Sequence, residues 1–191
     1  MKRHVVALAI ALCLPASSVV AQEAGTASGK GTMDRSVPGK TAGPLSEAYV
    51  AVDFYPHFSF ATREGKGAKA ATWIVLTDKP PPIKEWLAAA EPVETLRLWC
   101  GKEKASFVAL NLDANMEVDY YFLCPADGRV TSEGLNSANG LKSIVPKFET
   151  RDAKRLKGTL KTGQGNCPGP NGTSAYCKAT GDFAFDAPFA R

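Results

Sequence analysis

The sequence predicts a mainly β protein: an antiparallel β-sandwich, immunoglobulin-like or similar, of about seven or eight strands with one short helix and disulfide bonds. Three observations predict it. Apolar and polar residues alternate over short segments, which is the period of a strand buried on one face. Turn residues separate many of these segments by roughly 8–12 residues, as in sandwiches and barrels. Paired cysteines follow in the second half of the chain. A partly open barrel is the second architecture that this pattern allows.

The first 21 residues predict a signal peptide. Lys2 and Arg3 give a basic start, residues 5–14 are apolar, and small residues lead to Ala21. The apolar run is about ten residues long, whereas a membrane-spanning helix needs roughly 20. An uncleaved anchor is the alternative. We expect cleavage after Ala21 and an exported protein, periplasmic or secreted.

Residues 22–47 predict a flexible linker or tail. They are rich in Gly, Pro, Ser, Thr and Lys and contain almost no large apolar side chains. Such a segment cannot bury enough surface to offset the entropy of ordering it. Residues 48–191 then form a single β-sandwich domain of ordinary size.

The charge of the chain gives little reason to expect a nucleic-acid partner. Removing Lys2 and Arg3 takes the formal net charge from +4 to +2, and no run of five basic residues occurs. No later segment is long and apolar enough for a transmembrane span, so we expect none in the mature chain.

Four cysteines in an exported chain predict disulfide bonds: Cys100, Cys124, Cys167 and Cys177. Three pairings are possible. Cys167 and Cys177 flank a turn-rich loop, which favours local pairing and leaves Cys100 with Cys124. Two Cα atoms must lie within about 7 Å for a bridge. Strands separated by a third strand lie too far apart, so this pair must cross between layers or the strand order cannot be a simple meander.

The first expected strand, residues 49–60, contains His57. Val52, Phe54 and Phe58 alternate with polar residues, so His57 falls on the opposite face. Pro56 cannot donate a ladder hydrogen bond and marks an edge, a bulge or a break into two strands. Asp53 is about 13 Å away along a strand, too far to share a metal or a hydrogen bond with His57 unless Pro56 makes a sharp bulge. We therefore expect His57 to be a solvent-side or loop-covered strand residue.

The remaining elements follow from periodicity and from prolines. One helix is expected over residues 82–91, with Pro82 in its first turn and Pro92 ending it. Residues 141–149 stay ambiguous because Pro146 lies inside them. Strands are expected over residues 71–78, 95–100, 106–113, 117–124, 155–162 and 180–188.

No motif for a familiar catalytic or cofactor site is present. The nucleophile elbow, the zinc-protease helix, the phosphate loop and the dinucleotide fingerprint are all missing. The cysteine spacing does not suit zinc, so no metal and no cofactor are expected. Asp113, Glu117 and Asp119 are read as a charged hairpin tip.

One group of side chains suggests a binding surface. Tyr55, Trp99 and Tyr121 fall on the faces turned away from the expected core, with Arg97 in phase with Trp99. The alternative is that the helix over residues 82–91 covers them with Trp86 and Leu87 as a second small core.

These observations predict a non-catalytic binding or interaction module, of inhibitor, immunity or ligand-binding type. Its partner is expected to be another envelope or extracellular protein or a small ligand. The alternative is an envelope hydrolase that uses carboxylates assembled by the fold, with His57 as its base.

Overall fold

The computed structural model of the chain describes residues 23–38, 47–65, 70–126, 131–134, 144–162 and 179–191. The expected signal peptide lies outside these residues, as do Cys167 and Cys177. The strands in chain order are β1 (Gly25–Pro38), β2 (Glu47–Phe54), β3 (Phe58–Glu64), β4 (Ala71–Thr77), β5 (Phe107–Leu112), β6 (Val118–Cys124), β7 (Thr131–Gly134), β8 (Ile144–Arg151), β9 (Arg155–Thr162) and β10 (Ala179–Pro188). The helices are α1 (Ile83–Ala88) and α2 (Pro92–Glu103).

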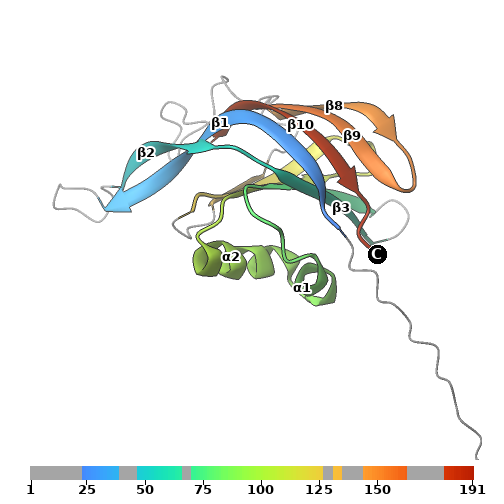
Figure 1. Cartoon of the computed structure of the whole chain (residues 1–191), viewed down its shortest axis with the longest axis horizontal. Helices are drawn as coiled ribbons and strands as arrows, with labels where there is room; N and C mark the ends of the chain where they lie inside the picture. The colour runs from blue at the N-terminus through green and yellow to red at the C-terminus, as the bar shows by residue number, and fades with distance from the viewer. Residues whose placement is uncertain (1–22, 39–46, 66–69, 127–130, 135–143, 163–178) are drawn as a thin grey trace, which may run out of the picture.

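The ten described strands form one antiparallel sheet that curls into a half-barrel (Figure 1). Its order is β7-β6-β5-β4-β3-β1-β10-β9-β8, and β2 pairs with the far part of β1. One half of the sheet is β3 to β6 and the other is β1, β10, β9 and β8. The curl also brings the end of β10 beside β3, where Ala61 and Phe189 form a parallel bridge.

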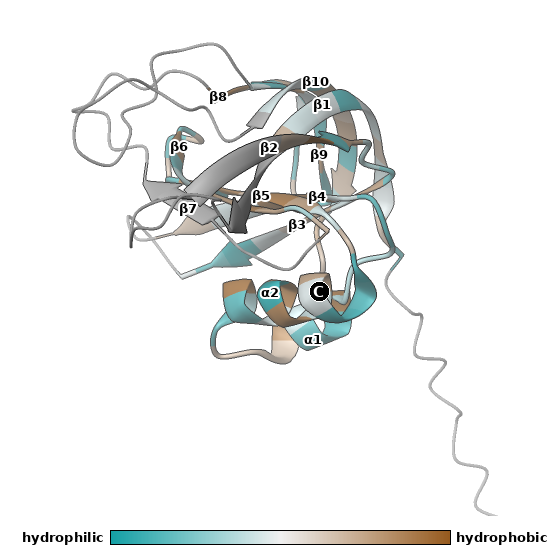
Figure 2. Cartoon of the chain, turned by 90° about the vertical axis from the view of Figure 1, so that its left-hand side faces the viewer, coloured by the Kyte–Doolittle hydropathy of each residue, from teal (hydrophilic) through white to brown (hydrophobic). Residues whose placement is uncertain are grey.

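The concave side of the half-barrel holds the main hydrophobic core. It takes one side chain in two from strands of both halves, as period-two alternation requires. Its largest fully buried members are Met33, Phe54, Ile74, Leu76, Leu110, Leu112, Leu123, Leu156 and Leu160. The hydrophobic strands β4 and β5 lie between this core and the helices (Figure 2).

The two helices cover the convex side of β3 to β6 and create a second core. Trp86 of α1 packs edge-on against Phe60 and Trp73, with ring centroids 5.6 Å away in each case. Leu96 and Cys100 of α2 are fully buried in the same cluster. The convex side of β1, β10, β9 and β8 has no helix over it among the described residues (Figure 1).

The expected antiparallel β class is confirmed, but the sandwich is not. A single continuous sheet curls around the core instead of two sheets packing face to face, which is closer to the partly open barrel. The physical reason is β1, which pairs with β10 on one edge and with β3 on the other and so joins the two halves.

The expected linker over residues 22–47 is wrong where it includes β1. Three successive inward positions of β1, Ala27, Gly29 and Gly31, are small because β10 fills the space opposite them: a Cβ on Gly31 would lie 2.4 Å from the ring of Phe183. At Gly29, φ is +120°, a conformation that favours glycine. A strand that packs against large neighbours through glycines carries little hydrophobic signal of its own.

The strand expected over residues 95–100 is also wrong, because this segment belongs to α2. Leu96, Leu98 and Cys100 fit a period of two, yet Leu98 is 59% exposed while Leu96 and Cys100, four residues apart, are buried. Burial at i and i+4 is the helical pattern. Pro92 begins α2 rather than ending α1, as suits its missing N–H. Two helices therefore replace the single expected one.

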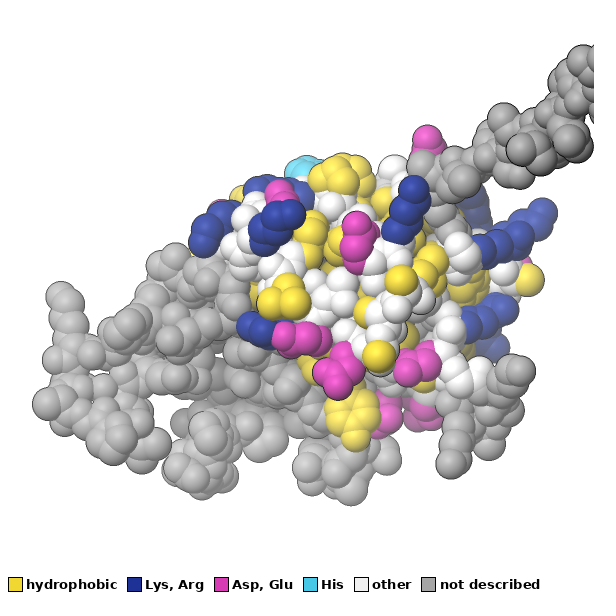
Figure 3. All heavy atoms as spheres, turned by 90° about the horizontal axis from the view of Figure 1, so that it is seen from below, with side chains coloured by type: hydrophobic (Ala, Val, Ile, Leu, Met, Phe, Trp, Pro, Cys, Tyr) yellow, Lys and Arg dark blue, Asp and Glu magenta, His cyan; other side chains and the backbone are white. Residues whose placement is uncertain are grey.

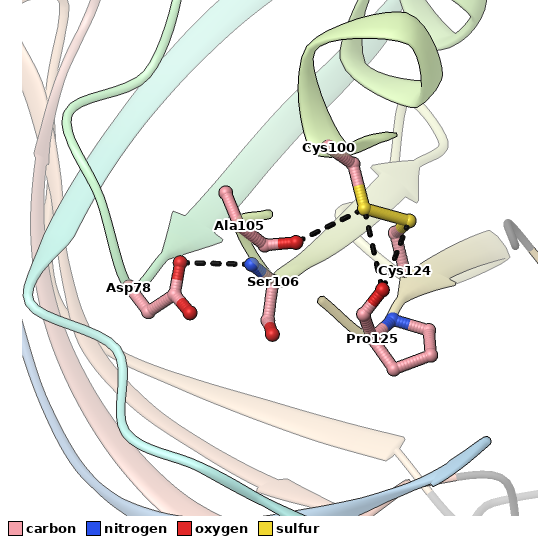
Figure 4. The surroundings of a disulfide bond; sticks show 6 residues. All are labelled: Asp78, Cys100, Ala105, Ser106, Cys124 and Pro125. Carbon is pink, nitrogen blue, oxygen red and sulfur yellow. Dashed lines mark hydrogen bonds between the residues drawn. A yellow bond between two sulfur atoms is a disulfide. The ribbon is translucent and has the colours of Figure 1, made fainter. Parts of the chain in front are cut away.

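The expected disulfide between Cys100 and Cys124 is confirmed (Figure 4). Its Cα atoms lie 6.6 Å apart. It joins α2 to the end of β6, so it links two layers and avoids the spacing problem of two strands in one sheet. The loop before β5 is held beside it, since Asp78 Oδ1 accepts a hydrogen bond from the backbone N–H of Ser106 at 2.8 Å.

Candidate binding surface

The open convex side of β1, β10, β9 and β8 carries the most developed surface feature among the described residues. Strand register aligns its outward side chains in rows across the sheet. The middle row is Ser28, Ala184, Thr159 and Lys147, and all four are exposed. Three of them have small side chains, so the surface along this row lies closer to the sheet backbone than the surface on either side of it.

Charged rows stand on both sides of the middle row. On one side Lys30, Asp182 and Lys161 follow one another from β1 to β9. On the other side Asp186 pairs in register with Lys157, which reaches Glu149 at 3.3 Å. Positions four residues apart on a strand are about 13 Å apart. The two charged rows are therefore about that far apart.

The low row between the charged rows forms a groove, which we call the convex groove. Two adjoining hollows of about 390 Å³ and 270 Å³ occupy it, and both are lined by Ser28 and Ala184. Its floor offers the hydroxyls of Ser28 and Thr159, and its walls offer both signs of charge. None of the side chains lining these hollows is an exposed aromatic ring.

The walls of the convex groove are held in place by cross-strand contacts. Arg155 Nη1 lies 3.2 Å from Asp186 Oδ2, and Lys161 Nζ lies 3.7 Å from Asp182 Oδ1. The other oxygen of Asp186 is buried and has no hydrogen-bond partner among the described residues. A buried acceptor without a donor is costly, so this oxygen lowers the stability that the ion pair of Asp186 gives to the wall.

Tyr55 lies beside one end of the convex groove. Lys30 Nζ is 5.6 Å from the centroid of its ring, and the Tyr55 hydroxyl donates to Asp53 Oδ2 at 3.0 Å. A side-chain hydrogen bond with Tyr55 raises the pKa of Lys30, and the negative charge of Asp53 acts in the same direction. Lys30 therefore presents a full positive charge at neutral pH.

The four residues expected to form an aromatic surface are not brought together. Tyr121 is 3% exposed and belongs to the concave core, so its expected outward orientation is wrong. The bulge between β5 and β6 shifts the alternation just before it. Trp99 is half-buried in the second core, and Arg97 pairs on the surface of α2 with Glu94. Only Tyr55 adjoins the convex groove.

The alternative that a helix covers a second core is correct in outline. Trp86 is buried there as expected, whereas Leu87 is 42% exposed. The aromatic residues that it covers are Phe60 and Trp73 rather than the expected Tyr55 and Tyr121.

His57 lies between β2 and β3, where Pro56 breaks the expected long strand in two. Its side chain is exposed and forms no hydrogen bond or ion pair with any described residue. Its backbone joins β1 and β4 through two hydrogen bonds. The N–H of His57 donates to the carbonyl of Thr77 at 2.8 Å, and its carbonyl accepts from the N–H of Ala27 at 3.0 Å. No Asp or Glu among the described residues pairs with His57 as an acidic partner for catalysis.

Sequence reasoning missed the convex groove, although one signal for it was visible. The strict alternation of residues 155–162 identified a strand, and its polar members contribute Lys161 to one wall, Lys157 to the other and Thr159 to the floor. Charged outward residues are ordinary on strands, however. The small residues that separate the two charged rows become apparent only from the register of β10 and β9 with β1, a strand that the sequence did not lead us to expect.

The described residues contain no group of three or more His, Cys, Asp or Glu side chains placed to hold a metal ion. None of the described helices has the length and hydrophobicity to cross a membrane. Comparison with protein-family models, curated proteins and solved structures finds nothing that matches this chain.

Proposed function

We propose that this chain is an exported, non-catalytic binding module that holds a segment of another protein in the convex groove. The observation that supports this most is the groove itself: a low row of small and hydroxyl side chains between two charged rows. It lies on the part of the convex side, over β1, β10, β9 and β8, that no described helix covers.

The charge pattern of the groove favours a protein ligand. Each wall alternates in sign, as in the series Lys30, Asp182 and Lys161, so neither wall attracts a uniform polyanion strongly. A polypeptide with acidic and basic residues complements such walls. Sugar ligands are less favoured, because no aromatic ring stands in the groove to stack on them.

The disulfide between Cys100 and Cys124 supports the expected location. Such bonds form and persist in oxidising compartments, including the periplasm and the cell exterior. This agrees with the signal peptide expected over residues 1–21.

The proposal is tested by capture of partners from envelope and secreted fractions. Three immobilised proteins are compared: the wild type, Ala184→Arg, which fills the groove from an exposed position, and Ala114→Arg, a matched change at an exposed turn between β5 and β6. Thermal unfolding first shows that all three are folded. A partner retained by the wild type and Ala114→Arg but lost with Ala184→Arg supports the proposal. Equal capture by Ala184→Arg contradicts it.

A further inference from the structure

The helix-bearing side of the molecule exposes hydrophobic side chains among charged ones (Figure 3). A further hollow, apart from the two of the convex groove, adjoins the helices. We call it the tryptophan cleft. It has a volume of about 180 Å³ and lies between the ends of β3 and β4 and the helices. It is lined by Thr62, Arg63, Glu64, Trp73, Trp86, Leu87, Ala89, Ala90 and Pro92.

Both indole groups of the cleft are fixed by hydrogen bonds to β3. Trp86 Nε1 donates to Thr62 Oγ1 at 3.2 Å, and Trp73 Nε1 donates to Glu64 Oε2 at 2.9 Å. The rings also meet edge-on at 5.6 Å. The wall is therefore rigid, and rigidity lowers the entropy that binding would cost.

Glu64 gives the cleft a negative charge. Its Oε2 accepts from Trp73, and no described residue forms an ion pair with the carboxylate. Arg63, the other charged residue of the lining, is directed elsewhere: its guanidinium lies 4.1 Å from the centroid of the Phe189 ring and donates to the carbonyl of Asp152. Successive strand residues point to opposite faces, which explains this separation.

The rest of the lining suits an alkyl chain. Leu87, Ala89, Ala90 and Pro92 form an apolar margin, and Leu87 is substantially exposed there. The volume is below the roughly 300–1,000 Å³ of usual small-molecule pockets. A single long side chain with an apolar stem and a charged end fits both the size and the chemistry.

We propose that the tryptophan cleft binds the side chain of a lysine or arginine from a partner protein. The stem packs on the apolar margin, and the cationic end donates to Glu64. This site is separate from the convex groove, since α1 covers the opposite half of the sheet. It would give the molecule a second anchor with its own specificity for basic side chains.

The test follows the three indole N–H signals of the described tryptophans by NMR, assigned with Trp→Phe variants. The probes are the blocked single residues Nα-acetyl-lysine methylamide and Nα-acetyl-arginine methylamide, with the norleucine analogue as the uncharged control. We expect a saturable shift of the Trp73 signal with the two cationic probes, and at least tenfold weaker binding of the norleucine probe. Equal shifts with all three probes, or no saturable shift, overturns the proposal without bearing on the convex groove.

Glu64→Gln provides the second measurement, because the amide oxygen still accepts from Trp73 Nε1 while the charge is lost. Binding of the lysine probe should weaken tenfold or more, because an ion pair with the carboxylate is replaced by a hydrogen bond to a neutral amide oxygen. Glu117→Gln, a matched change at an exposed position after the β5–β6 turn, should bind as the wild type does. Unchanged binding by Glu64→Gln overturns the proposal.

Discussion

Cys100 of α2 and Cys124 of β6 are joined by a disulfide that fixes the helical layer to the sheet. Both residues are fully buried, and 24 positions separate them along the chain. The bond closes a loop that contains β5, the hairpin turn and β6. It thereby links α2 to the sheet within the second core, which also contains Leu96 of α2 and Phe107 of β5.

Removal of this bond should destabilise the protein by about 3 kcal/mol, the loop-closure entropy of a loop of this length. The variant is Cys100→Ala with Cys124→Ala, compared with the wild type by chemical unfolding without reductant. The native wild type should also show no reactive thiol. A double variant as stable as the wild type would mean that the bond does not restrain the unfolded chain.

Trp86→Ala should lower the free energy of unfolding by about 3–5 kcal/mol, because the substitution leaves a large cavity between α1 and the sheet. Leu87→Ala, at the neighbouring half-exposed position, should cost under about 1 kcal/mol. Denaturant unfolding of both variants measures the contrast. Similar losses in the two would show that α1 does not pack through Trp86.

A chain that starts at Leu45 should fail to unfold cooperatively, because it lacks β1, the strand that joins the two halves of the sheet. A chain that starts at Gln22 keeps β1 and should melt with the same midpoint as the longer chain. Thermal scans by circular dichroism make the comparison. A cooperative transition with the wild-type midpoint in the shorter chain would show that residues 22–44 are a tail that the fold does not need.

Asp152 should make stability depend on acid pH. The backbone N–H groups of Lys154 and Arg155 hydrogen-bond to its carboxylate and lower its pKa below the ordinary value of 3.8. The charged form is thus favoured in the folded state, so its stabilisation is present above pH 3.8 and is lost as pH falls through the lowered pKa. Asp152→Asn should be slightly less stable than the wild type at pH 7.

The difference in the free energy of unfolding between Asp152→Asn and the wild type should then decrease below about pH 4. It should vanish once the carboxyl group of Asp152 is protonated. Urea unfolding at pH 7, 5 and 3 measures it. A difference that stays constant over this range would show that the charge of Asp152 has no part in the turn.

His57→Gln should change the free energy of unfolding by no more than about 0.5 kcal/mol, as for ordinary surface changes, since the side chain is exposed and the hydrogen bonds of His57 to other described residues come from its backbone. Partner capture should also be unchanged. Loss of an activity with an intact fold would instead support the hydrolase alternative.

Local patterns predicted those elements whose own residues carry the signal. β4, α1, β5, β6, β9 and β10 follow from alternation, from Pro82 and from turns. The bridge of Cys100 and Cys124 follows from the even number of cysteines and from the turn-rich loop that Cys167 and Cys177 flank. β1 could not be found this way, because its inward glycines make sense only against Phe183 of β10. α2 was misread because three apolar residues fit both periods, and only the sheet beneath decides which are buried. The convex groove depends on the register of four strands, and the pattern within any one strand does not show which residues lie next to each other across the sheet.

Site-specific photo-cross-linking shows whether a partner protein lies in the convex groove. A photoreactive amino acid is placed at Ser28, on the floor of the groove, and in a second protein at Ala114, an exposed position between β5 and β6. Each protein is irradiated in the presence of the envelope and secreted fractions. If the partner binds in the convex groove, we expect a discrete cross-linked product from position 28 and none from position 114. No product from position 28, or the same product from both positions, would contradict it.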